Sequence, residues 1–590
     1  MGHGIFEVDL FDGSLKGVAL ATLGFFKKFH LELLFVLAYL IALTVKNPSA
    51  DYFNNSVSVV CVLLIALLAT IKRRLYFGTN AIGFMMLFWL GLLIALCVIS
   101  PTVNFSLIYA SFLCFIPLFV LSGVFKCLNI KVLYLWLKLI TALIALYCIY
   151  EFVLTGERAN FFVIDPNFVG GVLGFIFVGM FFELLSVTNK QGCLLTAVLS
   201  FVVAAGMAAT QSRSALIFSI LIIVLLTICL RKFGYKRRVI AALVLIFMLG
   251  LSWYGIELLT MATEGKSLIE DRVNSAGRSI GARFDIWDAS VRMFLDAPVL
   301  GKGLGSFYTF YPDYRTEFLT TGTFAHNDYL QFFSEGGIVL GGFYIVISFI
   351  YFIFFVRNLL RCCSGDIENN QSRNSFGIQA GALLLMAQGG VNFVFYIAGS
   401  SLLLALGFSA VFQDKSQKEL KSNNKFGVMM GGSVVIVIAL FIVFSASVWW
   451  SSSAAKNANI HTKLALKLSE ETINNLEMHV ELNPFIYRPL MPLSENAILS
   501  VGSKMSDDER KILKARMAKY YKLTSKHMNL RCLSGLLAAE FAAEFPEEKG
   551  LAPGTKEQIL QQTYEKQPKC ELYYNLLIGP PVPVVDKNLN

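Results

Sequence analysis

Charged residues are scarce in this 590-residue sequence, because Asp, Glu, Lys and Arg together make up only 15% of it. Soluble globular domains carry about 25%. The hydrophobic fraction is 56% and the mean hydropathy is +0.63, which excludes a string of soluble domains. Eleven cysteines are too few for a disulfide scaffold of this length, and 51 Phe and 22 Tyr exclude a disordered chain. The composition indicates a protein that crosses a membrane many times.

Apolar runs long enough to span a bilayer recur along the chain. A membrane helix needs about 20 mainly apolar residues, and about thirteen runs meet that need to within one span. Lipid offers no partner for free backbone polar groups, so helices are the expected element. We therefore expect an all-α, polytopic membrane helix bundle. The candidate spans are 29–45, 56–71, 81–99, 105–125, 132–154, 168–186, 192–210, 214–230, 239–259, 336–356, 376–395, 397–412 and 427–450.

The basic residues between these runs predict the orientation. If the N-terminus is cytoplasmic, the inward connections hold 21 Lys and Arg, whereas the short outward ones hold only Lys46, Arg158 and Arg213. Cytoplasmic loops of membrane proteins carry such an excess. An odd number of spans then places the C-terminus outside. The first apolar run lacks a clear cleavage site and is interpreted as a retained span. The expected location is the bacterial inner membrane, with a cytoplasmic N-terminus and a periplasmic C-terminus.

Four regions follow from this pattern. Residues 1–259 are expected to form an N-terminal membrane bundle of about nine spans, and residues 336–450 a C-terminal set of about four. Residues 260–335 form a long periplasmic loop that is too aromatic for disorder and is expected to be the catalytic loop. Residues 451–590 are expected to form a periplasmic helical domain.

Local patterns refine the two outer regions. Helical spacing of apolar residues predicts an amphipathic helix over Ala282–Leu295, followed by a glycine-rich turn. In the C-terminal region, helices are expected over Asp507–Ser525 and Leu530–Glu544. Cys532 and Cys570 are its two cysteines. They could pair in an oxidising compartment or remain as buried thiols.

The run His326-Asn327-Asp328 lies where the long loop re-enters the membrane, and Glu335 follows it. A histidine at this boundary can titrate near neutral pH and take a proton from a hydroxyl group. The alternative is a structural histidine at a helix start. Asn327, Asp328 and Glu335 are the expected supporting residues. Asp328 or Glu335 could orient the imidazole or could equally stabilise a helix N-terminus.

Outward arginines break the positive-inside pattern. Arg213 stands in a very short turn between two apolar runs, and Arg283 lies on the aromatic helix close to Trp287. An arginine so close to hydrocarbon calls for a partner, and a lipid pyrophosphate would provide one. The alternatives are snorkelling for Arg213 and a helix salt bridge for Arg283. Arg278 is a less favoured candidate of the same kind, and Trp287 could stack on a sugar ring or pack in a core.

Other chemistries lack their signals. The sequence has no His/Cys metal spacing, and the Gly301–Gly305 run lacks the context of a nucleotide loop. Glu151, Glu183 and Glu257 lie toward the ends of their spans rather than at the centre, which weakens the case for a proton-coupled transporter. We expect no metal, no cofactor and no nucleic-acid partner.

Five motifs in order resemble the O-antigen ligase/polymerase superfamily. They are Asp165-Pro166-Asn167, Ser212-Arg213-Ser214-Ala215, Arg283-x-x-x-Trp287, the run from Ala297 to Phe307, and the His326 motif. The resemblance implies transfer of a glycan from undecaprenyl pyrophosphate to a hydroxyl group, with inversion and without metal or nucleotide. It also implies His326 as the catalytic residue, with Arg213 and Arg283 holding the pyrophosphate.

The C-terminal region favours one branch of that superfamily. An outer helical domain with an Asn-Pro segment is more similar to the bacterial protein O-oligosaccharyltransferases, so the favoured acceptor is a Ser or Thr of a pilin-like protein. An O-antigen ligase acting on lipid A core, or a polysaccharide polymerase, is the alternative. A transporter or flippase for lipid-linked glycan is the alternative from another class. Membrane lipids are the remaining expected partners.

Overall fold

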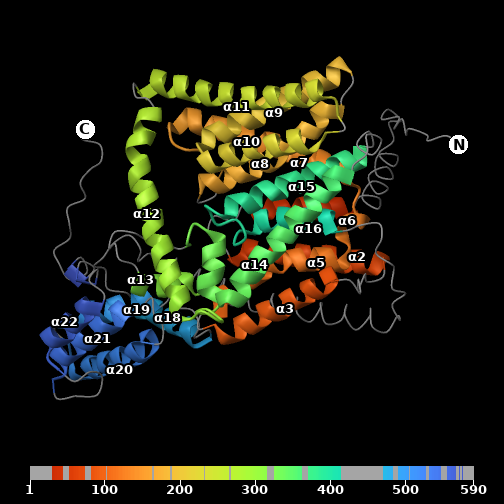
Figure 1. Ribbon diagram of the computed structural model, residues 1–590. Helices are drawn as coiled ribbons and strands as arrows, with labels where there is room; N and C mark the ends of the chain where they lie inside the picture. The colour runs from red at the N-terminus through yellow and green to blue at the C-terminus, as the bar shows by residue number, and fades with distance from the viewer. Residues whose placement is uncertain are drawn as a thin grey trace, which may run out of the picture.

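The computed structural model describes most of the chain, and the described part consists of helices joined by turns, without strands. The described residues are 30–43, 52–73, 81–100, 103–161, 165–186, 189–231, 233–264, 268–314, 324–361, 370–412, 469–482, 490–503, 505–525, 531–546, 554–566, 570–571 and 574–575. Six helices there are long and apolar enough to cross a membrane, and five shorter apolar ones accompany them. The protein is an all-α, multi-pass membrane protein, as the composition predicts (Figure 1).

The helices follow the expected spans closely. The first is His30–Leu43. The next are α2 (Tyr52–Arg73), α3 (Ala81–Ile99), α4 (Val103–Leu113), α5 (Phe115–Ser122), α6 (Val124–Cys127), α7 (Ile130–Thr155), α8 (Pro166–Ser186), α9 (Lys190–Thr210), α10 (Arg213–Cys229) and α11 (Tyr235–Glu264). After them come α12 (Leu268–Asp296), α13 (Phe307–Tyr314), α14 (Asp328–Arg361), α15 (Asn370–Gly389) and α16 (Ala398–Phe412). The expected span 427–450 lies outside the described residues.

Two spans differ from their expected form. The run 105–125 is divided into α4, α5 and α6, with Gly123 in the left-handed conformation at the end of α5. The run 376–395 is helical only to Gly389, where Gly389 and Gly390 lead into a turn. Residues 391–397 then form a non-helical connection to α16, and this connection proves central to the site.

Helix α8 occupies the middle of the bundle and is almost wholly buried. It contacts α7, α9, α10 and α15. Glycines permit these close approaches: a Cβ on Gly179 would lie 2.3 Å from the Tyr134 hydroxyl, and one on Gly171 would lie 2.0 Å from Gln388 Oε1. Membrane helices associate without a hydrophobic driving force, and small residues at their interfaces let the backbones approach closely.

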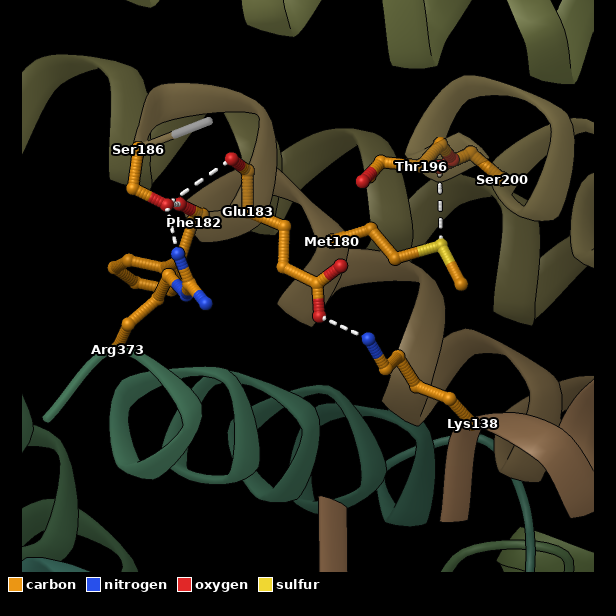
Figure 2. A network of polar contacts seen from close by, with 8 residues as sticks. All are labelled: Lys138, Met180, Phe182, Glu183, Ser186, Thr196, Ser200 and Arg373. Carbon is orange, nitrogen blue, oxygen red and sulfur yellow. Dashed lines mark hydrogen bonds and ion pairs between the residues drawn. The ribbon is translucent and has the colours of Figure 1, made fainter. Parts of the chain in front are cut away.

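Polar contacts fix α7, α8 and α15 at one end of the bundle. Lys138 of α7 and Glu183 of α8 form an ion pair of 2.7 Å between largely buried side chains. Nearby, an Nη atom of Arg373 in α15 donates a hydrogen bond of 2.6 Å to the Ser186 hydroxyl, and Figure 2 shows both contacts. Removing one partner of a buried ion pair leaves a charge uncompensated, so such pairs constrain the helices that carry them.

Helix α12 leaves this arrangement and runs beside the bundle, from the end of α11 toward α13 (Figure 1). It contains the expected amphipathic helix and extends it at the N-terminal side. Its buried face forms a small core with α13 and the segment before α14. That core comprises Ile286, Ala289, Met293, Phe307, Tyr311 and Ala325. Helix α12 therefore reaches the residue that precedes His326.

The C-terminal region has helices and a core of its own. They are α18 (Glu470–Leu482), α19 (Leu490–Ser500), α20 (Asp507–Thr524), α21 (Arg531–Glu544) and α22 (Lys556–Lys566). The two helices expected from the sequence are α20 and α21. Cys532 and Cys570 form a disulfide within this core, which decides between the two alternatives that the sequence leaves open.

Candidate active site

His326 has an unusual backbone conformation that its neighbours hold in place. Its φ angle is +50°, in the left-handed region, which costs a residue with a side chain about 1–2 kcal/mol. The preceding residue, Ala325, is bonded on both sides: its carbonyl oxygen accepts from Trp287 Nε1 at 3.0 Å, and its N–H donates to Gln331 Oε1 at 3.0 Å. Strained residues persist where the surrounding structure over-determines them, and they cluster at functional sites.

The imidazole of His326 is half-buried and lies against an aromatic pair. Its ring meets the Phe393 ring edge-on with centroids 5.0 Å apart, and Phe393 stacks on Phe324 at 4.5 Å. The Nδ1 atom is buried and makes no hydrogen bond within the described part of the chain. The side-chain amide of Asn392 acts on the ring.

Asp328 accepts hydrogen bonds from the α15–α16 connection. Its side chain is fully buried, and Oδ2 accepts from the N–H groups of Val394 at 2.6 Å and Phe395 at 3.1 Å. Its own N–H donates to the carbonyl oxygen of Asn392 at 3.2 Å. Oδ2 is thus occupied with backbone N–H groups, while Oδ1 is buried and has no hydrogen-bond partner in the described part of the chain. The carboxylate places residues 392–395 against the start of α14 instead of contacting the imidazole.

Glu335 organises the glycine-rich turn in the same manner. Its carboxylate accepts from the N–H groups of Gly305 at 2.9 Å and Phe307 at 3.1 Å, and from the Tyr396 hydroxyl at 2.9 Å. A Cβ on Gly301, whose φ is +66°, would lie 2.3 Å from the carbonyl carbon of Glu335. The turn therefore fits closely against α14. Asn327 has a local role, because its Oδ1 accepts from the Leu330 N–H and caps the helix.

Arg213 and Arg283 lie in each other's electrostatic field. Arg283 is half-buried on α12, while Arg213 is exposed at the first position of α10. Burial is the main cause that lowers the pKa of Arg283; the Arg213 charge lowers it further, and Asp165 raises it. A cation at a helix N-terminus opposes the helix dipole, so helix stability does not explain Arg213.

Neither arginine has a salt bridge with another described residue. Asp288, five residues after Arg283 on α12, pairs with Arg292 at 2.7 Å. The salt-bridge alternative for Arg283 thus finds no partner in the described ranges. The side chain of Arg278 lies outside the described residues, although its backbone belongs to α12. Two arginines without carboxylate partners suit an anionic ligand.

Two charged side chains and one amide, from three different segments, act on His326. Burial is the main cause that lowers the pKa of the imidazole below its ordinary 6.5. Arg283 lowers the pKa as well, whereas Asp165 and a contact with Asn392 raise it. The lowered pKa favours the neutral form of the imidazole. A neutral ring can accept a proton, which is the requirement for a general base.

Asp165 and Asn392 are residues of this site that the sequence analysis gives no role. Asp165 stands just before α8, where its Oδ1 accepts from the Asn167 N–H at 2.7 Å. Asn167 in turn accepts from Arg158 through its side chain at 3.0 Å and from Gln388 through its carbonyl oxygen at 2.7 Å. Asp165-Pro166-Asn167 is recognisable as a motif in the sequence. Asn392 lies inside an apolar run and has no sequence pattern that marks it as a site residue.

The comparison with protein families decides the identity of this region. Residues 195–345 match the sequence model of the O-antigen ligase family. The chain carries an O-antigen ligase domain. The ligase domain contains Arg213, Arg283 and His326, starts after Asp165 and ends before Asn392. Its presence supports a glycosyltransferase of the O-antigen ligase/polymerase type that uses lipid-linked glycan in a membrane.

Two further observations bear on the ligase domain. No curated protein matches the chain. No group of three or more His, Cys, Asp or Glu side chains that could hold a metal ion occurs among the residues described.

Proposed function

We propose that the protein transfers a glycan from undecaprenyl pyrophosphate to a hydroxyl group of an acceptor. The observation that carries the proposal is the shared environment of His326, Arg283 and Arg213, within the ligase domain. The acceptor oxygen attacks the anomeric carbon and its proton passes to the imidazole. The bond from that carbon to the pyrophosphate oxygen breaks, and the leaving pyrophosphate keeps the electron pair. Direct attack inverts the anomeric carbon.

The arginines serve the leaving group in this proposal. Negative charge on the pyrophosphate rises as the bond breaks, and fixed cations stabilise it most at that point. Each charge-assisted hydrogen bond is worth about 1.5–3 kcal/mol. The reaction needs no metal in this proposal, because the two guanidinium groups supply the positive charge.

Donor binding tests this role directly. Arg213→Gln and Arg283→Gln should each weaken binding of purified lipid-linked oligosaccharide by about tenfold or more, the equivalent of one lost charge-assisted bond. Arg292→Gln is the matched control, since Arg292 lies on the same helix and is half exposed in its pair with Asp288. Unchanged donor affinity in both variants would remove the arginines from the donor site.

We place the reaction on the periplasmic side. The excess of basic residues in the alternate connections supports this orientation. The Cys532–Cys570 disulfide supports an oxidising compartment for the C-terminal helices. A reporter fused after Asn590 should register outside the cytoplasm, and a cytoplasmic signal would contradict the orientation.

For the acceptor we favour a Ser or Thr of a pilin-like protein. The separate helical core after the membrane helices supports an acceptor of protein size. Deleting the gene should then abolish a glycoprotein and leave O-antigen intact. Loss of O-antigen instead would favour lipid A core as the acceptor, and loss of a capsular or secreted polysaccharide would favour the polymerase.

A transporter of lipid-linked glycan is the competing function. Purified protein in detergent should transfer glycan to an acceptor, whereas a flippase would only move labelled lipid-linked glycan across liposomes. Movement in liposomes without transfer in detergent would contradict the enzyme proposal.

A further inference from the structure

Asn392 has a buried amide with unused hydrogen-bonding groups. The residue is 2% exposed, and neither Oδ1 nor Nδ2 has a hydrogen-bond partner in the described part of the chain. A buried polar group without a partner costs about 1–3 kcal/mol. Such a group in a native structure calls for an explanation.

His326 is a side chain on which this amide acts, and it also carries an unused atom. Its Nδ1 is also buried without a hydrogen bond in the described chain, and the amide is among the groups that act on the ring. Phe393, which directly follows Asn392 in the chain, meets the imidazole edge-on with ring centroids 5.0 Å apart. Catalytic hydrogen bonds are often long in free enzymes and tighten when substrate binds.

We propose that Asn392 is a positioning residue for His326. Its Oδ1 accepts a hydrogen bond from Nδ1–H of the imidazole and so leaves Nε2 unprotonated to take the proton of the acceptor hydroxyl. The inference rests on the proposed function, in which His326 is the base. The group that fixes the second nitrogen of a histidine determines its tautomer and its orientation.

The connection that carries Asn392 is held firmly. Asp328 bonds three of its backbone groups, at residues 392, 394 and 395. Farther along, the Ser401 hydroxyl donates to the Phe395 carbonyl oxygen at 2.6 Å. Asp328 thus acts on His326 through the placement of Asn392, although its carboxylate does not touch the ring.

An amide suits this position better than a carboxylate would. The charged groups facing the imidazole from neighbouring elements are Asp165, before α8, and Arg283, on α12. A second carboxylate would favour the protonated ring, and a protonated ring cannot act as a base. The neutral amide orients the ring and leaves it uncharged beside Arg283.

The test compares Asn392→Ala and Asn392→Asp in the purified full-length protein. Acylation of His326 by diethyl pyrocarbonate, followed against pH by mass spectrometry, reports its pKa without any need for transfer. We expect the midpoint to fall in Asn392→Ala, which lacks the acceptor, and to rise by about one unit or more in Asn392→Asp. Equal midpoints in all three proteins would overturn the proposal.

Transfer assays on the same proteins supply the second readout. We expect kcat to fall about tenfold to a hundredfold in Asn392→Ala with an unchanged KM for the donor. Asn392→Asp should recover part of that loss above the raised midpoint. Asn358→Ala, at the far end of α14, is the control and should match the wild type. Wild-type kcat in Asn392→Ala would overturn the proposal. Absence of transfer by the wild-type protein would instead contradict the proposed function. The acylation midpoints would then decide on the role of Asn392.

Discussion

The indole Nε1 of Trp287 donates a hydrogen bond of 3.0 Å to the carbonyl oxygen of Ala325, the residue before His326. This bond connects the amphipathic helix α12 to the segment that carries the candidate base. Arg283 lies one helical turn before Trp287 on α12. The same helix therefore carries an arginine of the proposed donor site and holds the backbone next to the histidine.

Replacing Trp287 with Phe should separate these two roles. The ring contact with Phe284 can persist, while the hydrogen bond is lost, which costs about 1 kcal/mol of folding free energy. We expect kcat to fall about tenfold or more, because small displacements of a catalytic group have large effects. Donor affinity should stay close to that of the wild type. Phe284→Leu is the control, and equal kcat in Trp287→Phe and wild type would contradict the positioning role of this bond.

The pH dependence of transfer follows from the state of His326. The base must be neutral, so the rate should fall as pH decreases through the pKa of the imidazole. Burial lowers that pKa below 6.5 in the free protein, which places the acidic limb of kcat/KM below 6.5. Asp165 raises the pKa, and Asp165→Asn should therefore move the limb to still lower pH. A limb that moves to higher pH in Asp165→Asn would contradict the assignment.

The kink of α14 depends on Gly337. Its φ is +61° and its ψ is −160°, a combination that is essentially restricted to glycine. A Cβ there would lie 2.2 Å from the carbonyl oxygen of Val299. Gly337→Ala should cost more than about 2 kcal/mol of folding free energy and should lower the yield of folded protein in detergent.

Gly342 on the same helix provides the matched control. A Cβ at Gly342 would come no closer than 3.7 Å to its neighbours, and alanine is the better helix former. Gly342→Ala should therefore fold as well as the wild type. Equal thermal stability of Gly337→Ala and Gly342→Ala would show that the kink does not need glycine.

The C-terminal helices should depend on their disulfide. Cys532 and Cys570 are 38 residues apart, and cross-links of this kind stabilise by about 2–4 kcal/mol. Replacing both cysteines with alanine should make α18–α22 more susceptible to limited proteolysis and leave the membrane helices unaffected. Mass spectrometry after alkylation without reduction should find these two cysteines unmodified. Alkylation of both would contradict the disulfide.

The sequence predicts the helices well because their signals are local. Apolar runs of bilayer length predict α3 and α8 almost to the residue, and helical spacing predicts the C-terminal half of α12. The breaks at Gly123 and after Gly389 are missed, because both lie inside apolar runs that hydropathy alone reads as continuous helix. Here the chain follows packing rather than hydropathy.

The site is predictable only where a motif is compact. His326, Arg213 and Arg283 stand out as polar residues beside apolar runs, and the structure brings them into one electrostatic environment. The roles of Asp328 and Glu335 depend on Val394 and Tyr396, partners that lie more than 60 residues away in the sequence. No spacing rule reveals such partners. Asn392 is hidden for the same reason.

Glycan transfer from purified lipid-linked oligosaccharide by wild-type protein and by His326→Asn tests the central claim most directly. Asparagine tolerates the left-handed conformation of this position, so the variant should fold and bind donor while lacking the base. We predict transfer by the wild type and a rate lower by about a hundredfold or more in His326→Asn, with unchanged donor affinity. Transfer by His326→Asn at the wild-type rate would contradict the account.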